Sequence, residues 1–122
     1  MSALDEDELR IVAESDLDFE VHLVAGDGID EDLSLATRAT VVIRETLAGA
    51  DLVLRTTAAA DLTIVAGEAL LRAAPLTAPE LLLLPDGIYV GQAAIEIGGV
   101  DRWVFTDPFR VRIRHAFAPV LP

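Results

Sequence analysis

The chain has 122 residues, 52% of them hydrophobic, which fits one ordinary globular domain and is too short for two of full size. The absence of cysteine excludes disulfide frameworks, thiolate metal sites and cysteine nucleophiles. The formal net charge of −12, with nine arginines and no lysine, disfavours nucleic acid as a partner, because nucleic-acid-binding domains carry an excess of positive charge.

The acidic residues are concentrated at the start of the chain. Residues 1–32 hold twelve acidic residues and one arginine, so the remaining residues are nearly neutral as a group. Ser2 and Asp5 have the spacing of a helix capping box, but the apolar positions that follow are too sparse to bury a helix face. We therefore predict an acidic N-terminal arm over residues 1–16. Its candidate interface acids are Asp5, Glu6, Asp7 and Glu8.

Alternation of apolar and polar residues starts at Asp18 and predicts a strand with one buried side and one solvated side. The apolar residues are Phe19, Val21 and Leu23, and the polar residues are Asp18, Glu20 and His22. After glycines at 26 and 28, the same reasoning predicts strands over 38–46, 51–57, 62–66 and 68–73. In the first of these, Ala39, Val41 and Ile43 share a face; in the second, Leu52 and Leu54 do.

One short helical element interrupts the strands. Thr77 and Glu80 have the spacing of a capping box, and Pro79 falls in the first turn, where its missing N–H costs nothing. A single helical turn is therefore expected near 77–83, and the Pro-Asp-Gly sequence at 85–87 ends it.

The last third of the chain predicts three more strands. The first starts at Ile88 with Tyr89 on its apolar face, and the second covers 101–106, where Trp103 and Phe105 face together. We expect Trp103 and Tyr89 to be core residues. The final strand, 109–117, has the clearest alternation. Its inward residues are Phe109, Val111, Ile113, His115 and Phe117, and its outward residues are Arg110, Arg112 and Arg114.

These elements predict an all-β domain over residues 17–118, followed by a short tail at 119–122. Seven or eight short strands separated by regular turns, with almost no helix, are typical of an antiparallel immunoglobulin-like β-sandwich. A small closed barrel is the alternative.

Few residues suggest chemistry. The chain has two histidines, His22 and His115, without a metal-ligand spacing, and no Gly-x-Ser-x-Gly sequence. We interpret His115 as a partly buried residue satisfied by a backbone carbonyl. The acidic segment 27–32 departs from a calcium-loop pattern and reads as a solvated turn, although the sequence leaves calcium binding there open. No catalytic residue, metal site or cofactor is predicted, and the chain is not expected to be an enzyme.

The arginines of the final strand are the most informative side chains. Three guanidinium groups at every second residue form a row suited to carboxylates. Their expected complement is the face of Asp18, Glu20 and His22 together with the acidic arm. The contact is expected either within one molecule, through neighbouring strands, or between molecules in a head-to-tail ring.

The chain also resembles a known family. The resemblance is carried by the start of the first strand at 16–19, the segment 32–44 that ends in Arg44, the Leu76-Thr77 turn, the Gly87-Ile-Tyr entry into a strand, and the closing segment 103–113. This order is similar to the N-terminal immunoglobulin-like domain of phage baseplate upper proteins and to related small tail proteins of tailed phages. It implies a structural role in a virion. Departures are Asp107-Pro108 before the last strand and no fibre region within the sequence.

Two functions follow as hypotheses. The first is a structural protein of a tailed bacteriophage or phage-like particle, made in the host cytoplasm, that assembles with copies of itself and with other virion proteins. The second is a carbohydrate-binding module, which needs an exposed aromatic platform. No apolar run approaches the length that spans a bilayer and the start lacks the features of a signal peptide, so no membrane partner is expected.

Overall fold

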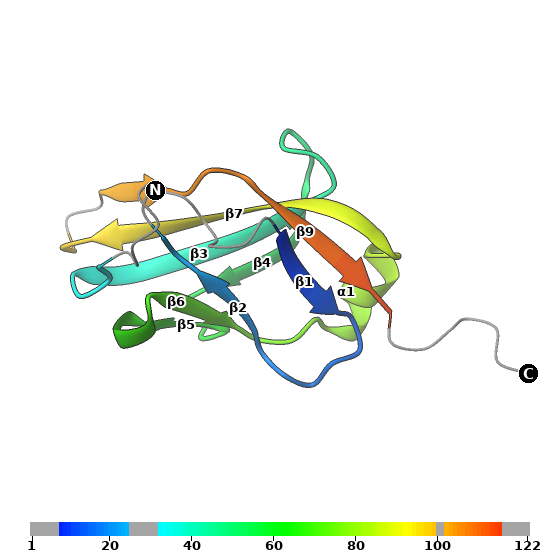
Figure 1. Ribbon diagram of the computed structural model, residues 1–122, viewed down its shortest axis with the longest axis horizontal. Helices are drawn as coiled ribbons and strands as arrows, with labels where there is room; N and C mark the ends of the chain where they lie inside the picture. Colours follow the sequence, from blue (N-terminus) through cyan, green and yellow to red (C-terminus); the bar gives the residue numbers. More distant parts are fainter. Residues whose placement is uncertain (1–7, 25–31, 100–101, 116–122) are drawn as a thin grey trace, which may run out of the picture.

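Two β-sheets face each other across a hydrophobic core in the computed structural model, which describes residues 8–24, 32–99 and 102–115 (Figure 1). The larger sheet has the strand order β1-β9-β7-β3-β4, with β8 paired to β7, and the smaller sheet has the order β2-β6-β5. The larger sheet comprises β1 (Glu8–Val12), β3 (Ala36–Arg44), β4 (Asp51–Thr56), β7 (Gly87–Ile97), β8 (Trp103–Phe105) and β9 (Phe109–Arg114). The smaller sheet comprises β2 (Phe19–His22), β5 (Leu62–Val65) and β6 (Leu70–Ala73). The all-β sandwich is therefore confirmed, and its two separate sheets exclude the closed barrel.

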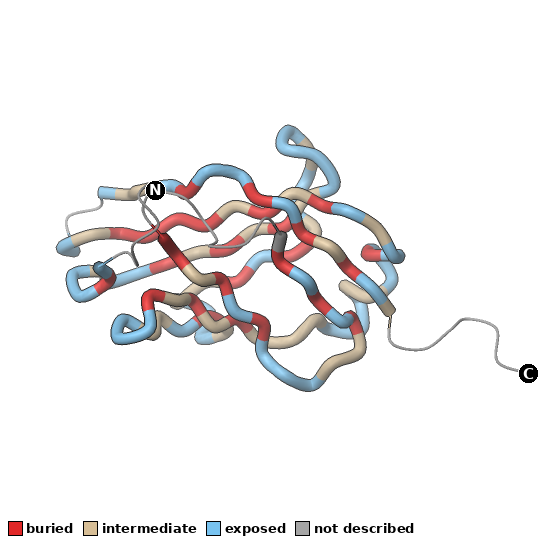
Figure 2. The backbone as a smooth tube through the Cα atoms, viewed as in Figure 1, coloured by how far each residue is buried: buried red, intermediate tan, exposed pale blue. Residues whose placement is uncertain are grey.

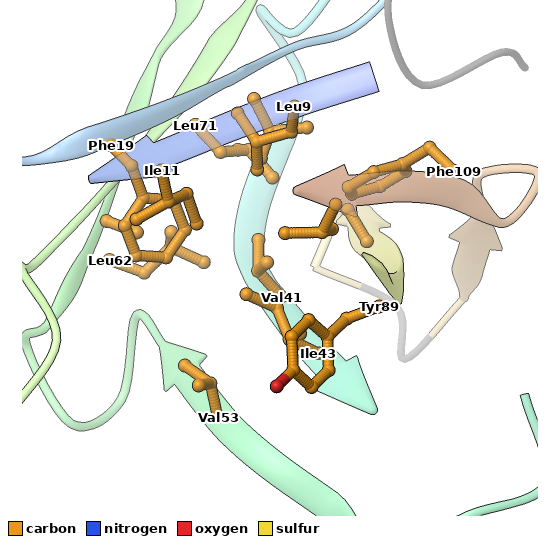
Figure 3. Packing of buried hydrophobic residues seen from close by; sticks show 14 of the residues in the cluster. Leu9, Ile11, Phe19, Val41, Ile43, Val53, Leu62, Leu71, Tyr89 and Phe109 are labelled. Atoms are coloured by element: carbon orange, nitrogen blue, oxygen red, sulfur yellow. The ribbon is translucent and has the colours of Figure 1, made fainter. Parts of the chain in front are cut away.

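The core is built by the alternating apolar residues of both sheets. Buried and exposed positions alternate along most strands (Figure 2), as expected when one face of each strand meets the other sheet. Val41 and Ile43 of β3 and Val111 and Ile113 of β9 are fully buried in one cluster with Leu71 of the smaller sheet (Figure 3). The inward faces predicted for the first, second and last strands are confirmed at every described apolar position. Those positions are Phe19, Val21, Leu23, Ala39, Val41, Ile43, Phe109, Val111 and Ile113.

The predicted arm is wrong for residues 8–12, which form β1. This strand pairs in parallel with β9, so segments from the two ends of the described chain lie side by side (Figure 1). Leu9 and Ile11, at alternate positions of β1, share one face of the strand and are buried in the core cluster. The structure therefore has nine strands within its described residues rather than seven or eight, and its pairing is not purely antiparallel.

The β4 strand shows how register decides which side of a strand is buried. The sequence predicted that Leu52 and Leu54 share a face, but Leu54 is 48% exposed while Leu52 packs against the core, and the fully inward residues are Val53 and Arg55. Pairing with β3 places Val53 opposite buried Ile43 and Arg55 opposite buried Val41. Partners across a strand pair share a face, so Leu54 points outward, whereas Leu52, at the register shift between Val53 and Asp51, is partly buried and packs against the core.

The short helix is confirmed as α1 (Ala78–Leu83). The Thr77 side chain accepts a hydrogen bond from the backbone of Glu80, and the Glu80 carboxylate accepts one from the backbone of Thr77. This reciprocal pair is the capping box that the sequence predicted. A 3-10 turn, η1 (Ala66–Glu68), separates β5 from β6 where the sequence predicted strand to begin at 68.

Candidate functional site

Four arginines lie at one corner of the larger sheet. They are on the face of this sheet that is turned away from the smaller sheet, and we call that face the outer face. Arg112 of β9 lies directly opposite Arg10 of β1, while Arg110 lies opposite Glu8 and Arg114 opposite Val12. Arg110 and Arg114 are exposed and Arg112 is partly exposed. We call the set Arg10, Arg110, Arg112 and Arg114 the arginine corner. The sequence predicted the row of three; the fourth, Arg10, was missed because its segment was not recognised as a strand.

Aliphatic side chains lie among these arginines. Val12, opposite Arg114, is 49% exposed, and Ile88 of β7, opposite Arg112, is 46% exposed. Elsewhere on the outer face, Arg44 Nε lies 2.6 Å from Asp51 Oδ1. The corner thus combines grouped positive charge with exposed aliphatic surface.

The acids predicted to complement the arginine row lie elsewhere. β2 belongs to the smaller sheet, so Asp18 and Glu20 are not on a strand next to β9. Glu20 instead accepts a hydrogen bond from Arg72 Nε at 2.9 Å on β6. The predicted intramolecular pairing of these two acids with the arginine row is therefore wrong, because hydrogen bonding to β6 carries β2 into the other sheet.

The remaining predicted acids are mostly outside the described residues. Asp5, Glu6 and Asp7 lie outside them, as do residues 27–31 of the candidate calcium segment, and Glu8 belongs to β1. Asp32 is exposed, and its carboxylate accepts a hydrogen bond from the Ser34 backbone at 2.9 Å. That hydrogen bond lowers the Asp32 pKa.

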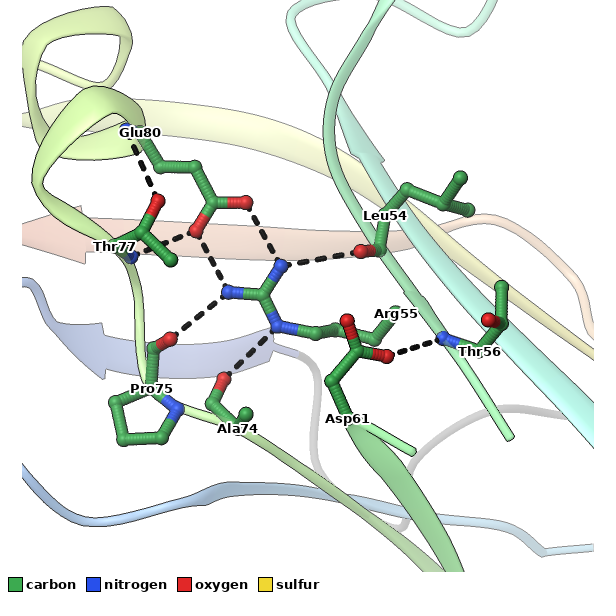
Figure 4. Close-up of polar contacts among 8 residues, drawn as sticks. All are labelled: Leu54, Arg55, Thr56, Asp61, Ala74, Pro75, Thr77 and Glu80. Atoms are coloured by element: carbon green, nitrogen blue, oxygen red, sulfur yellow. Dashed lines mark hydrogen bonds and ion pairs between the residues drawn. The ribbon is translucent and has the colours of Figure 1, made fainter. Parts of the chain in front are cut away.

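A buried ion pair that the sequence did not predict joins α1 to the sandwich (Figure 4). The Arg55 guanidinium donates to both carboxylate oxygens of Glu80, at 2.8 and 2.7 Å, and to the carbonyls of Leu54, Ala74 and Pro75. Only 4% of the Arg55 side chain and 15% of the Glu80 side chain are exposed. All five N–H groups of the guanidinium donate to Glu80 or to these backbone carbonyls, so no donor is left for a ligand. The pair therefore positions α1 and is not a ligand site.

The pKa values of this pair follow from its contacts. Burial alone would raise the pKa of Glu80, but hydrogen bonds from Arg55 and Thr77 outweigh it and hold the pKa below its ordinary value. The hydrogen bond to Glu80 raises the pKa of Arg55. Both groups are therefore charged at neutral pH.

Trp103 is not the core residue that the sequence predicted. β8 pairs with β7 so that Trp103 lies opposite Glu96 and Phe105 opposite Ala94, which places both aromatic rings on the outer face. Trp103 is partly exposed, Phe105 is 63% exposed, and Arg38 lies 5.3 Å from the centre of the tryptophan ring. The Arg38 Nε also donates to buried Glu96 at 3.0 Å. Tyr89, the other aromatic residue predicted for the core, is confirmed there.

His115 follows the end of β9 and bridges three segments. Its ring Nε2 lies 2.9 Å from the carbonyl oxygen of Leu84, which confirms the predicted backbone partner. Its Nδ1 lies against the carboxylate of Glu14, and its backbone N–H donates to Asp86 at 2.9 Å. The imidazolium, with two N–H groups, satisfies both acceptors, whereas the neutral ring satisfies one. The Leu84 hydrogen bond and then the Glu14 carboxylate therefore raise the pKa of His115.

This contact predicts a pH dependence of stability. Because the pKa of His115 is raised by folding, its contribution is fully present below the ordinary value of 6.5 and is lost as the pH rises through the folded value. We expect urea midpoints of the wild type to fall over that range and those of His115→Gln to fall less. Parallel pH profiles for wild type and His115→Gln would contradict the assignment.

No family, curated protein or solved structure compared with this chain matches it. Within the described part of the chain, no helix is long and apolar enough to cross a membrane. The same residues contain no group of three or more histidine or acidic side chains arranged to hold a metal ion.

Proposed function

We propose that this chain is a structural protein that acts by assembling with copies of itself and with neighbouring subunits. The observation that carries the proposal is the arginine corner, where grouped arginines lie beside exposed Val12 and Ile88. Arginine is enriched in protein interfaces, and an aliphatic surface next to it gains free energy when a partner excludes water. The rigid double-sheet scaffold holds this surface in place.

The particle in which the chain assembles is proposed to be that of a tailed bacteriophage or phage-like element. The support is the resemblance of its strand order and turn residues to small tail and baseplate domains. The confirmed β-sandwich is compatible with such a domain. The protein would then be made in the bacterial host cytoplasm and reside in the virion, with other virion proteins as its neighbours.

Assembly through charge can be tested by reversing the arginine row. We expect the wild type to self-associate, and Arg110→Glu/Arg112→Glu/Arg114→Glu to weaken association by about tenfold or more, because rim and interface charges each contribute roughly 1 kcal/mol. Deleting residues 1–7 removes the candidate acids Asp5, Glu6 and Asp7 and leaves β1 complete. This deletion is also expected to weaken self-association. Mass photometry and analytical ultracentrifugation measure the effect.

The matched control is Arg102→Glu, a reversal at an exposed arginine outside the corner. It is expected to assemble as the wild type does, and circular dichroism checks that every variant is folded. Unchanged assembly of both the triple variant and the deletion would reject docking through these charges.

A carbohydrate-binding module is the second candidate, because Phe105 and Trp103 offer aromatic surface on β8. The fluorescence of Trp103, the single tryptophan of the chain, distinguishes the two functions. Quenching by an oligosaccharide would support sugar binding, and no response across a panel of glycans would reject it.

A further inference from the structure

We propose that the groove between β1 and β2 binds an extended segment of a partner protein in which apolar and basic residues alternate, and that this segment adds to β2 as a further strand. The inference goes beyond the proposed function, because it concerns a different surface and stands whether or not the chain self-assembles. Three features carry it: the hollow between the two strands, the edge position of β2, and the acidic side chains at the rim.

The groove lies where the two sheets are open to solvent at one side of the sandwich. β1 and β2 lie on this side (Figure 1) and, with the segment 15–18, they line a hollow of about 380 Å³. A second hollow of about 460 Å³ adjoins it at Leu17, whose side chain is 78% exposed. Leu9, Ile11 and Phe19 line the first hollow and keep 6–8% of their surface exposed. The groove therefore reaches the rim of the core, and an apolar side chain placed there is removed from water.

The backbone of β2 can hydrogen-bond to an added strand. β2 lies at the end of the strand order of the smaller sheet, and among the described strands it pairs only with β6. Just after β2, the N–H of Leu23 donates to the carbonyl of Ala69 on the β6 side at 2.8 Å. Backbone groups alternate between the two sides of a strand, so those of Glu20 point to the free edge. A strand edge of this kind is a template for pairing with an extended segment of another chain.

The alternation along β2 determines the chemistry of the added segment. Directly opposite residues of neighbouring strands share a face of the sheet. A residue opposite Phe19 therefore points into the groove, where an apolar side chain is favoured. A residue opposite Glu20 points to the other face, where the acidic side chains lie, so the matching segment has apolar and charged residues at alternate positions.

The charges at the rim favour basic residues in that segment. Arg72 Nε donates to Glu20 at 2.9 Å, and Arg10 also takes part in an interaction within the chain. The exposed carboxylates of Asp16 and Asp18 make no hydrogen bond or ion pair within the part of the chain that the structure describes. The charge left uncompensated at the rim is therefore negative, and the net charge of −12 attracts a basic segment and repels nucleic acid.

A partner of another kind fits this groove better than a second copy. Of the described strands, β9 is the one in which apolar and basic residues alternate. Its two edges are already paired, with β1 on one side and β7 on the other. A folded copy of this chain therefore cannot present β9 as an added strand.

The experiment measures binding of three labelled peptides to the full chain by fluorescence polarisation. The first alternates valine and lysine, with four lysines. The second has the same composition with its lysines in one block, and the third alternates valine and glutamate. We expect the first to bind about three- to fivefold more tightly than the second, because each misplaced exposed ion pair costs up to about a fivefold loss. The third is expected to bind at least about tenfold more weakly than the first, because its charges are repelled.

Variants locate the site. Asp16→Asn/Asp18→Asn is expected to weaken binding of the valine–lysine peptide by at least about threefold, and Leu17→Ser by about fivefold. The matched controls are Asp107→Asn and Leu47→Ser, at exposed positions outside both hollows, and they are expected to leave binding unchanged. Circular dichroism checks that every variant is folded.

N-methylation of the peptide tests strand addition directly. Only one alternate set of its backbone N–H groups faces β2, so methylating that set is expected to abolish binding and methylating the other set to preserve it. Equal effects of the two methylations, equal binding of the alternating and block peptides, or unchanged binding by Asp16→Asn/Asp18→Asn would each overturn the inference. Peptide binding by a chain that stays monomeric would support it and count against the proposed self-assembly. Self-assembly without a preference for the valine–lysine peptide would overturn this inference alone.

Discussion

Replacing Glu80 by glutamine is expected to lower the free energy of unfolding by about 3 kcal/mol, because it leaves the buried Arg55 charge without an opposite charge. Arg55 keeps its hydrogen bonds to the carbonyls of Ala74 and Pro75, which places the loss at the lower end of the range for broken buried pairs. Glutamine can still accept the capping hydrogen bond from Thr77 through its one amide oxygen, so the substitution keeps the cap while it removes both the charge and the second acceptor of Arg55. Urea denaturation at neutral pH measures the change.

The matched control is Glu20→Gln, which breaks the exposed pair with Arg72. Both side chains of that pair are more than 40% exposed, so the expected loss is below about 1 kcal/mol. Equal losses for Glu20→Gln and Glu80→Gln would show that burial does not strengthen the Arg55 pair. Acid titration gives a second check. The Glu80 pKa is lowered by folding, so its contribution is present above the ordinary value of 4.5 and is lost as the pH falls through the folded value.

Replacing Gly91 by alanine is expected to destabilise the fold by about 2 kcal/mol through overpacking. A Cβ atom at this position would lie 2.4 Å from Cε2 of Phe109 and 2.8 Å from Cγ2 of Val111. Gly91 of β7 lies opposite Phe109 of β9, and the phenyl ring occupies the space that a side chain would fill. The packing of β9 on β7, which also holds the arginine row, therefore depends on this glycine.

Two further variants test that explanation. Gly67→Ala, at a glycine with no atom within 4 Å of the added Cβ, is expected to change stability by less than about 0.5 kcal/mol. The cost of Gly91→Ala is expected to shrink in a Phe109→Leu background, because the smaller side chain leaves room for the methyl group. An undiminished cost in that background would reject the clash with Phe109 as the cause.

Local pattern in the sequence was sufficient for most of the fold. Strict alternation over 109–114 identified both faces of β9, and the Thr77 and Glu80 spacing identified the start of α1. These features depend on residues within one strand or one turn. The physical rules behind them, the two-residue period of a strand and the hydrogen bonds of a helix start, act over the same short distances.

Features that depend on pairing between distant segments could not be predicted from the local sequence pattern. β1 contains only five residues and follows a run of acidic residues, so the alternation of Leu9 and Ile11 was too short to predict a strand. Arg55 and Glu80 are 25 positions apart in the sequence. The one local indication that Arg55 is buried was its position two residues after Val53, which places both side chains on the same face of the strand. Trp103 fell on the outer face because of its register with Glu96, which no property of 103–105 determines.

The sequence by itself determined an all-β chain with an arginine row on one side of its last strand, because strand periodicity and charge are properties of neighbouring residues. The tertiary structure alone decided that β1 adds Arg10 to that row, that β2 takes Asp18 and Glu20 into the other sheet, and that Arg55 is buried against Glu80. Strand order and register depend on burying the apolar residues of all strands together in one core. A shift of one residue in the pairing would exchange the two faces of a strand, so residues within a single strand cannot determine it.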